Sequence, residues 1–235
     1  FPRITLKQAI ELSNNRIKPE DLPPIESKPV STFLPTTTLK RKTPPRKRLA
    51  KDLHILCFVN HYYNPKQQEG FTGGATVKGN TNRETVVTQA ITALRNIPSC
   101  DVRVCGLRGF TVPGIEVDID FTGIKPWNLV YESLNYMNNF TNDYDYFINI
   151  EDDILLKENV IQNVIEFNRL RSIDEVFLPN RIEIEKGECR FVDLRGGWKK
   201  DSPTIIFKNR ILKIANNYHS AILILSTRQY RYAYN

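Results

Sequence analysis

The chain has 235 residues, of which 40% are hydrophobic and 10% aromatic, enough for one substantial core. No apolar stretch approaches the ~18 residues of a membrane span, and no signal-peptide pattern opens the printed sequence. Its net charge of +7 equals the charge of a single run, Leu39–Lys51, which holds seven basic residues and no acid. The rest is close to neutral, so the basic pI describes this run and not the body of the protein.

Residues 1–51 differ in composition from the remainder of the chain. Eight of the fourteen prolines lie here, and the segment reads as an extended N-terminal arm or linker. The basic run Lys40–Lys51 suits peripheral contact with anionic lipid head groups, and a solvated linker explains it equally well. We expect no nucleic-acid partner.

From residue 52 onward the pattern becomes regular. The apolar run 53–62 predicts a buried strand, and 82–96 predicts a helix with one apolar face. Further strands are expected at 101–107, 114–121 and 144–150, and helices at 127–139 and 157–171. Strand-like stretches at 175–179, 187–194 and 221–226 come next, separated by loops.

This order of elements predicts an α/β fold. We expect a mostly parallel, Rossmann-type sheet with helices on both faces, followed by a smaller mixed C-terminal half. One domain would then cover residues 52–235, with a nucleotide-binding half at 52–153 and an acceptor half at 154–235.

The most informative motif is three consecutive carboxylates, Glu151, Asp152 and Asp153, directly after the strand 144–150. Such acids repel one another and are costly to desolvate, so a cation is the natural partner. Mg²⁺ or Mn²⁺ suits carboxylate oxygens, and α/β sheets bind ligands at the carboxyl ends of their strands. The simpler alternative is a polar turn that opens the next helix, with the acids facing its dipole.

The segment Tyr146–Leu156, with its Glu-Asp-Asp triplet, resembles the DxD motif of the GT-A glycosyltransferases. A second likeness is Asn217–Ser226, where a histidine precedes a late apolar strand, as in that family's C-terminal metal-binding histidine. The resemblance spans about residues 52–230. It implies a metal-dependent transferase with a nucleotide-diphospho-sugar donor.

The resemblance also implies roles for individual residues. Asp153 would contact Mn²⁺ or Mg²⁺ directly, Glu151 and Asp152 would hold the ribose or metal-bound waters, and His219 would complete the metal shell. The metal would bridge the two phosphates of the donor and stabilise the departing diphosphate. From the residues alone, His219 is equally a hydrogen-bonded loop residue.

Other polar residues follow predicted strands or open helices. Asn60, His61 and Tyr62 end the first strand and can bind a base and ribose, or merely cap the strand. Arg83, in the first turn of a helix, can meet a diphosphate or lie on the surface.

The Asp-Ile-Asp at 118–120 lies at the end of a short strand and is a rival for the metal motif. We prefer the triplet at 151–153, because it follows the longer and more apolar strand. Asp120 is then a candidate to accept from a base N–H or a ribose hydroxyl.

Candidates for the acceptor side follow the strand at 175–179. Glu183 is a candidate base to deprotonate an acceptor hydroxyl, and Asp201 is its rival. Arg181 can offset diphosphate charge or pair with Glu183. For each of them, a solvated surface loop is the simpler explanation.

The sequence thus predicts a glycosyltransferase that uses a UDP- or GDP-sugar and a glycan, lipid-linked or protein acceptor. The alternatives are a nucleotidyltransferase and a non-catalytic binding module recruited through the basic arm. Cellular location stays open: a cytoplasmic or membrane-associated protein is favoured, and a secretory lumen is compatible with an upstream anchor.

Overall fold

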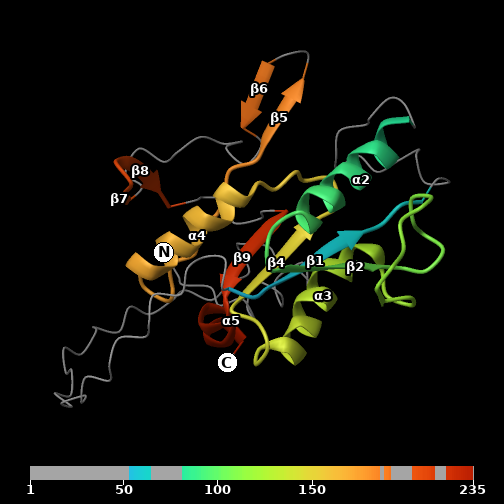
Figure 1. The fold of residues 1–235 in the computed structure, drawn as a ribbon, viewed down its shortest axis with the longest axis horizontal. Helices are drawn as coiled ribbons and strands as arrows, with labels where there is room; N and C mark the ends of the chain where they lie inside the picture. The colour runs from blue at the N-terminus through green and yellow to red at the C-terminus, as the bar shows by residue number, and fades with distance from the viewer. Residues whose placement is uncertain (1–52, 65–80, 186–187, 192–202, 215–220, 235) are drawn as a thin grey trace, which may run out of the picture.

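The main sheet has four parallel strands and one antiparallel strand (Figure 1). The computed structural model describes residues 53–64, 81–185, 188–191, 203–214 and 221–234. The spatial order is β3 (Ile119–Asp120), β2 (Cys100–Gly106), β1 (Ile55–His61), β4 (Tyr146–Glu151) and β9 (Ile222–Ser226). β9 runs against β4, and the other neighbouring pairs are parallel. The expected α/β class and mostly parallel sheet are confirmed.

Helices cover both faces of this sheet, as the sequence predicted. α2 (Thr81–Arg95) and α4 (Glu158–Leu170) pack on one face, and α3 (Leu129–Met137) and α5 (Thr227–Tyr234) pack on the other. All seven residues of β1 are buried, because alternate side chains enter the two cores. This explains why its sequence is continuously apolar up to Asn60.

Helix α4 packs on the sheet through the apolar residues that recur along one of its faces. Ile161, Val164, Ile165 and Phe167 recur at helical spacing and are all buried. Burying each such side chain contributes about 2 kcal/mol before entropy is counted. The helix ends at Leu170, and Arg171 has an extended backbone.

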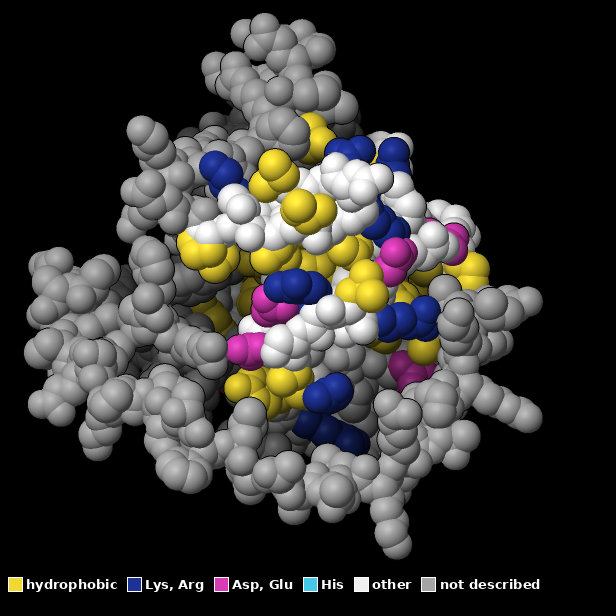
Figure 2. All heavy atoms as spheres, turned by 90° about the vertical axis from the view of Figure 1, so that its left-hand side faces the viewer, with side chains coloured by type: hydrophobic (Ala, Val, Ile, Leu, Met, Phe, Trp, Pro, Cys, Tyr) yellow, Lys and Arg dark blue, Asp and Glu magenta, His cyan; other side chains and the backbone are white. Residues whose placement is uncertain are grey.

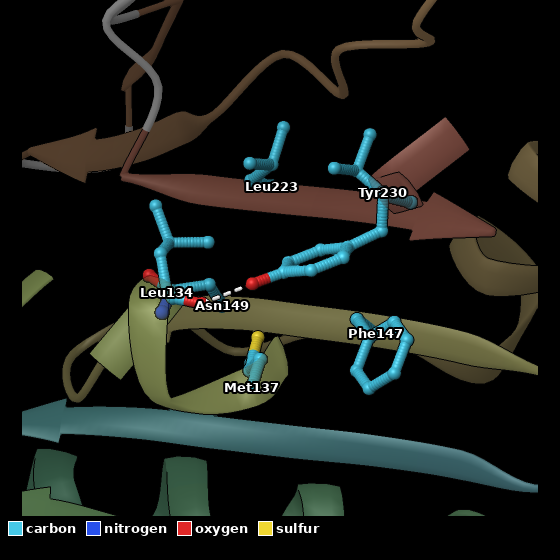
Figure 3. Close-up of a pocket in the computed structure, with 7 residues that line it drawn as sticks. Leu134, Met137, Phe147, Asn149, Leu223 and Tyr230 are labelled. Atoms are coloured by element: carbon cyan, nitrogen blue, oxygen red, sulfur yellow. Dashed lines mark hydrogen bonds between the residues drawn. The ribbon is translucent and has the colours of Figure 1, made fainter. Parts of the chain in front are cut away.

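Tyr230 of α5 closes the other core (Figure 3). Its ring packs on Phe147 of β4 with centroids 5.1 Å apart, and its hydroxyl donates to the carbonyl oxygen of Leu134 at 2.5 Å. The gap between Tyr230, Met137 and Leu223 is too narrow for a water molecule. These contacts tie the end of the described chain to α3 and to the sheet.

Two hairpins stand apart from the main sheet. One joins β5 (Ile182–Glu185) to β6 (Glu188–Phe191), and the other joins β7 (Thr204–Phe207) to β8 (Arg210–Lys213). Short 3-10 turns flank α3, at Pro126–Asn128 and at Asn138–Phe140. In the described parts of the chain, no helix is long and apolar enough to cross a membrane.

Several local expectations differ from the structure, and the strands β5, β7 and β8 were not expected at all. Residues 175–179 form no strand, and the expected strand at 114–121 shrinks to the two residues of β3. Helix α5 was not expected, because its eight residues are too few for the sequence pattern alone to indicate a helix. Apolar content alone did not decide these segments, since a strand also needs a neighbour for its backbone groups.

Candidate functional site

The carboxyl ends of β1 and β4 lie side by side at one edge of the sheet. Asn60 is paired in register with Glu151, and His61 is paired with Gly106, which in turn is paired with Asp120. With strands about 4.8 Å apart, β3 and β4 are separated by about 14 Å along this edge. Residues from four separate stretches of sequence therefore lie along the edge where such sheets bind ligands.

Asp152 is the inward-facing member of the acidic triplet. It is 2% exposed, and its Oδ2 lies 2.5 Å from Nδ1 of His61, which is itself fully buried. The backbone N–H of Val112 donates to Nε2 of the same imidazole at 3.0 Å. Because Nε2 accepts this bond, Nδ1 carries the proton and donates it to Asp152.

Arg83 joins the acidic triplet from the first full turn of α2. Its guanidinium contacts Asp152 Oδ1 at 2.5 Å and Asp153 Oδ2 at 3.1 Å. The buried carboxylate of Asp152 thus has a cation on one oxygen and an imidazole N–H on the other. A buried charge needs such partners, so this arrangement fixes the turn that follows β4.

Glu151 and Asp153 point outward on either side of Asp152. The side chain of Asp153 is 46% exposed, and Glu151 is exposed as well. The pKa of Glu151 is raised from its ordinary value, first by partial desolvation and next by the negative charge of Asp153. The positive charge of Arg181 acts in the opposite direction, so Arg181 lies within electrostatic reach of Glu151.

Asn60 does not face the edge of the sheet as expected. Its amide donates to Asn149 Oδ1 at 2.8 Å, and its oxygen lies 2.6 Å from the hydroxyl of Ser133 on α3. Asn149 in turn donates to Ser133 Oγ at 2.8 Å, which closes a buried polar triangle between β1, β4 and α3. The triangle satisfies polar groups inside the core, where leaving one unpaired is costly.

His61 likewise differs from its expected role in binding base or ribose, because both ring nitrogens are bonded within the protein. The same correction applies to Asp152, whose carboxylate is occupied by His61 and Arg83. Gly106 beside them has no room for a side chain: a Cβ there would lie 2.9 Å from Val117 Cγ2 and 3.0 Å from the carbonyl oxygen of His61.

Of residues 60–62, only Tyr62 has a side chain that is partly accessible to solvent. It is partly buried and stacks on Phe110, with centroids 5.6 Å apart and planes 24° apart. The N–H of Tyr63 donates to the carbonyl oxygen of Phe110 at 2.9 Å, so the loops after β1 and β2 run together. Two aromatic rings therefore stand beside the edge that carries the acidic triplet.

Asp120 lies at the same edge but is held by its own loop. Its Oδ1 accepts from the Thr122 hydroxyl and N–H, and its Oδ2 lies 3.3 Å from Nε of Arg108. The Thr122 hydroxyl is the main reason that the pKa of this carboxyl is lowered. Asp118 is occupied as well, since it accepts from the N–H of Val104 at 2.7 Å.

The candidates for the acceptor side are only partly described. Arg181 precedes β5 and approaches Glu151, and Glu183 lies within β5 opposite Arg190, with a side chain outside the described part. Asp201, His219 and the basic run Lys40–Lys51 lie outside the described residues.

The described residues fit a divalent cation only in part. Among them, no group of three His, Cys, Asp or Glu side chains is placed to hold a metal ion. Glu151 and Asp153 nevertheless supply two outward carboxylates at the carboxyl end of β4. That donor set suits Mg²⁺ or Mn²⁺, which typically takes one or two carboxylates and completes its shell with phosphate oxygens and water.

Two cysteines of the main sheet are buried within its cores. Cys57 and Cys105 are free thiols, and burial is the main cause that raises the pKa of each. A raised pKa keeps a thiol protonated, so neither side chain is suited to act as a nucleophile.

Comparison with known proteins adds no family to this description. No family model matches the chain, and no curated protein matches its sequence. The sheet and the acidic triplet themselves are therefore the basis for assigning a function.

Proposed function

We propose that this protein is a metal-dependent glycosyltransferase of the GT-A type that takes a nucleotide-diphospho-sugar as donor. The observation that carries the proposal is that the three side chains of the acidic triplet point in different directions. Asp152 is turned inward and anchored, while Glu151 and Asp153 are turned outward at the carboxyl end of β4. A purely structural turn has no need of two further acids beside a buried one.

The sheet supports this assignment by its geometry. The strand order β3-β2-β1-β4-β9, with β9 antiparallel, leaves the ends of β1 and β4 adjacent below the start of α2. The first turn of a helix favours negatively charged groups, and Arg83 adds a guanidinium at the same place. A diphosphate bound there would meet both.

Each described side chain then has a defined task. Glu151 and Asp153 would hold the cation, and Arg83 would bind a phosphate oxygen after leaving Asp153. Tyr62 and Phe110 offer aromatic faces to the base, and Arg181 balances the charge of Glu151. A divalent cation bound to these carboxylates would supply the positive charge that stabilises a departing diphosphate.

Binding of nucleotides in solution tests the proposal directly. We expect UDP or GDP to raise the melting temperature of the wild-type protein only when Mn²⁺ or Mg²⁺ is present. Asp153→Asn should abolish this shift. Asp143→Asn is a matched control, because Asp143 is exposed near the opposite end of β4 and should leave the shift intact.

A donor panel then separates the transferase from its rivals. Release of a nucleoside diphosphate from one UDP- or GDP-sugar, dependent on Asp153, supports glycosyl transfer. Release of pyrophosphate from a nucleoside triphosphate would favour a nucleotidyltransferase. Failure of every nucleotide to bind, with or without metal, would overturn the proposal.

A further inference from the structure

Arg83 contacts two carboxylates that differ strongly in burial. Its Nη2 lies 2.5 Å from Oδ1 of Asp152, whose side chain is 3% exposed. Its Nη1 lies 3.1 Å from Oδ2 of Asp153, whose side chain is 46% exposed. The guanidinium therefore bridges the anchored acid of the triplet and one of its two outward acids.

The two contacts of this bridge are unequal in strength. The contact with Asp152 is short, and breaking it would leave a buried carboxylate without its cation. The contact with Asp153 is longer and open to solvent, and exposed ion pairs contribute little to stability. Figure 2 shows such neighbours of opposite charge at the surface, on the side that lies on the left in Figure 1. Arg83 can thus release Asp153 while it stays bound to Asp152.

Release of Asp153 would free two groups at once. Nη1 of Arg83 now donates to Oδ2 of Asp153, so the movement frees a charged donor and a charged acceptor together. The donor suits a phosphate oxygen, and the acceptor suits a divalent cation. One small movement therefore prepares the site for both parts of a metal–diphosphate complex.

Either ligand by itself would meet an unfavourable charge. At Asp153, a divalent cation would have to replace Nη1 and would then lie beside the guanidinium, which has a charge of the same sign. At Arg83, a diphosphate would approach the exposed carboxylates of Glu151 and Asp153. When both are bound, each offsets the charge that opposes the other. This is the condition for positive coupling between two ligands, and such coupling is reciprocal.

Arg83 acts on Asp152 and Asp153, whereas Arg181 acts on Glu151. Desolvation and the charge of Asp153 raise the pKa of Glu151, and the positive charge of Arg181 lowers it. The bridge of Arg83 therefore controls access to Asp153 and leaves Glu151 to Arg181. A substitution of Arg83 accordingly tests the availability of one outward carboxylate.

We propose that Arg83 couples binding of a divalent cation to binding of a diphosphate, because its guanidinium holds Asp153 until a phosphate group draws it away. The inference rests on the donor site proposed above and adds that the cation alone binds weakly, whereas cation and diphosphate bind together. Arg83 then has two opposite effects. It excludes a cation before the donor binds, and it holds a phosphate oxygen afterwards.

Binding of Mn²⁺ in the absence of nucleotide tests the proposal, with free Mn²⁺ measured by electron paramagnetic resonance. Arg83→Gln removes the competing charge, so the full chain with this substitution should bind Mn²⁺ about tenfold more tightly than the wild type. Arg83→Gln/Asp153→Asn should lose that gain. Arg95→Gln is the matched control at the exposed opposite end of α2 and should bind Mn²⁺ as the wild type does.

A second measurement leaves Arg83 in place and so does not depend on the folding of a variant. Sulfate is an oxyanion that binds Mn²⁺ weakly in solution and forms charged hydrogen bonds with a guanidinium. At constant ionic strength, replacing chloride by sulfate should tighten binding of Mn²⁺ to the wild type several-fold. The same replacement should leave binding to Arg83→Gln unchanged.

Equal affinities of the wild type and Arg83→Gln for Mn²⁺ alone would overturn the coupling, and so would the absence of a sulfate effect in the wild type. The donor site itself would stand in either case if UDP or GDP with Mn²⁺ still raises the melting temperature of the wild type. Failure of every nucleotide to raise it would instead remove the donor site, and the coupling with it.

Discussion

His61 at the end of β1 and Asp152 after β4 form a buried contact of 2.5 Å between imidazole and carboxylate. The second nitrogen of His61 accepts from the N–H of Val112, which lies in the loop after β2. One histidine thus links three segments at the carboxyl edge of the sheet. The outward direction of Glu151 and Asp153 follows from this inward anchor.

The first prediction compares the contributions of Asp152 and Asp153 to the stability of the folded protein. Asp152→Ala should lower the free energy of unfolding by about 3 kcal/mol, because it leaves the buried ring of His61 without its acceptor and Arg83 without its main partner. Asp153→Ala should cost less than about 1 kcal/mol, since its ion pair with Arg83 is exposed. Urea denaturation of both variants measures the difference.

Equal losses of stability in the two variants would contradict the inward placement of Asp152. Asp152→Asn is an informative intermediate, because its amide keeps one oxygen toward His61 and loses the charge that Arg83 needs. Its stability should fall between that of Asp152→Ala and the wild type.

The second prediction concerns Arg83. Its guanidinium bridges Asp152 and Asp153, and it lies at the start of α2 where a diphosphate would bind. Arg83→Ala should weaken binding of a metal-bound nucleoside diphosphate about tenfold or more, since a charged hydrogen bond of this kind contributes about 1.5–3 kcal/mol. Isothermal titration calorimetry gives the affinity.

Arg95→Ala is the matched control, because Arg95 ends the same helix and is exposed. It should leave nucleotide affinity unchanged. Unaltered affinity in Arg83→Ala, with the melting temperature accounted for, would show that Arg83 serves only to neutralise the acidic triplet.

The third prediction follows from the raised pKa of Glu151. Its native pKa lies above that of the unfolded chain, chiefly through desolvation and then through Asp153, so the native state binds the proton more tightly. Stability therefore falls as pH rises from the ordinary glutamate pKa through the raised one. Glu151→Gln removes this loss and should raise the melting temperature at neutral pH.

At pH values below the ordinary pKa of glutamate, the wild type and Glu151→Gln both carry an uncharged group at position 151. Their melting temperatures should therefore converge. Metal binding reverses this dependence of stability on pH, because a cation binds the ionised carboxylate. Added Mn²⁺ should stabilise the wild type increasingly as pH rises, and Glu151→Gln should show a much smaller effect. A melting temperature of Glu151→Gln that stays below wild type at neutral pH contradicts the prediction.

The central elements could be predicted from sequence because their signals are local. The apolar run around Phe58 and the helical repeat of Val164 and Phe167 arise from neighbours a few residues apart. Such periodicity reports which faces are buried, and burial largely determines secondary structure. The strand expected at 114–121 was too long, since only β3 forms there, and helix α5 was missed, because both outcomes depend on packing partners distant in the chain.

Within the candidate site, the sequence located the acidic triplet but did not show which residues turn inward. It left Asn60 and His61 as either ligand-binding or strand-capping residues and gave Asp152 a role beside the ligand, and in the structure all three are bonded inside the protein. One available signal was overlooked: Asn149 is a polar residue within a buried strand, and such a residue needs an internal partner. Asn60 is that partner.

The sequence by itself determined that three acids follow a buried strand of an α/β domain and that Arg83 opens a helix. Only the tertiary structure decided which acid turns inward. His61 lies 91 positions before Asp152, and Arg83 lies 69 positions before it. A carboxylate is oriented by the cations and N–H groups around it, and folding of the sheet brings those groups to Asp152.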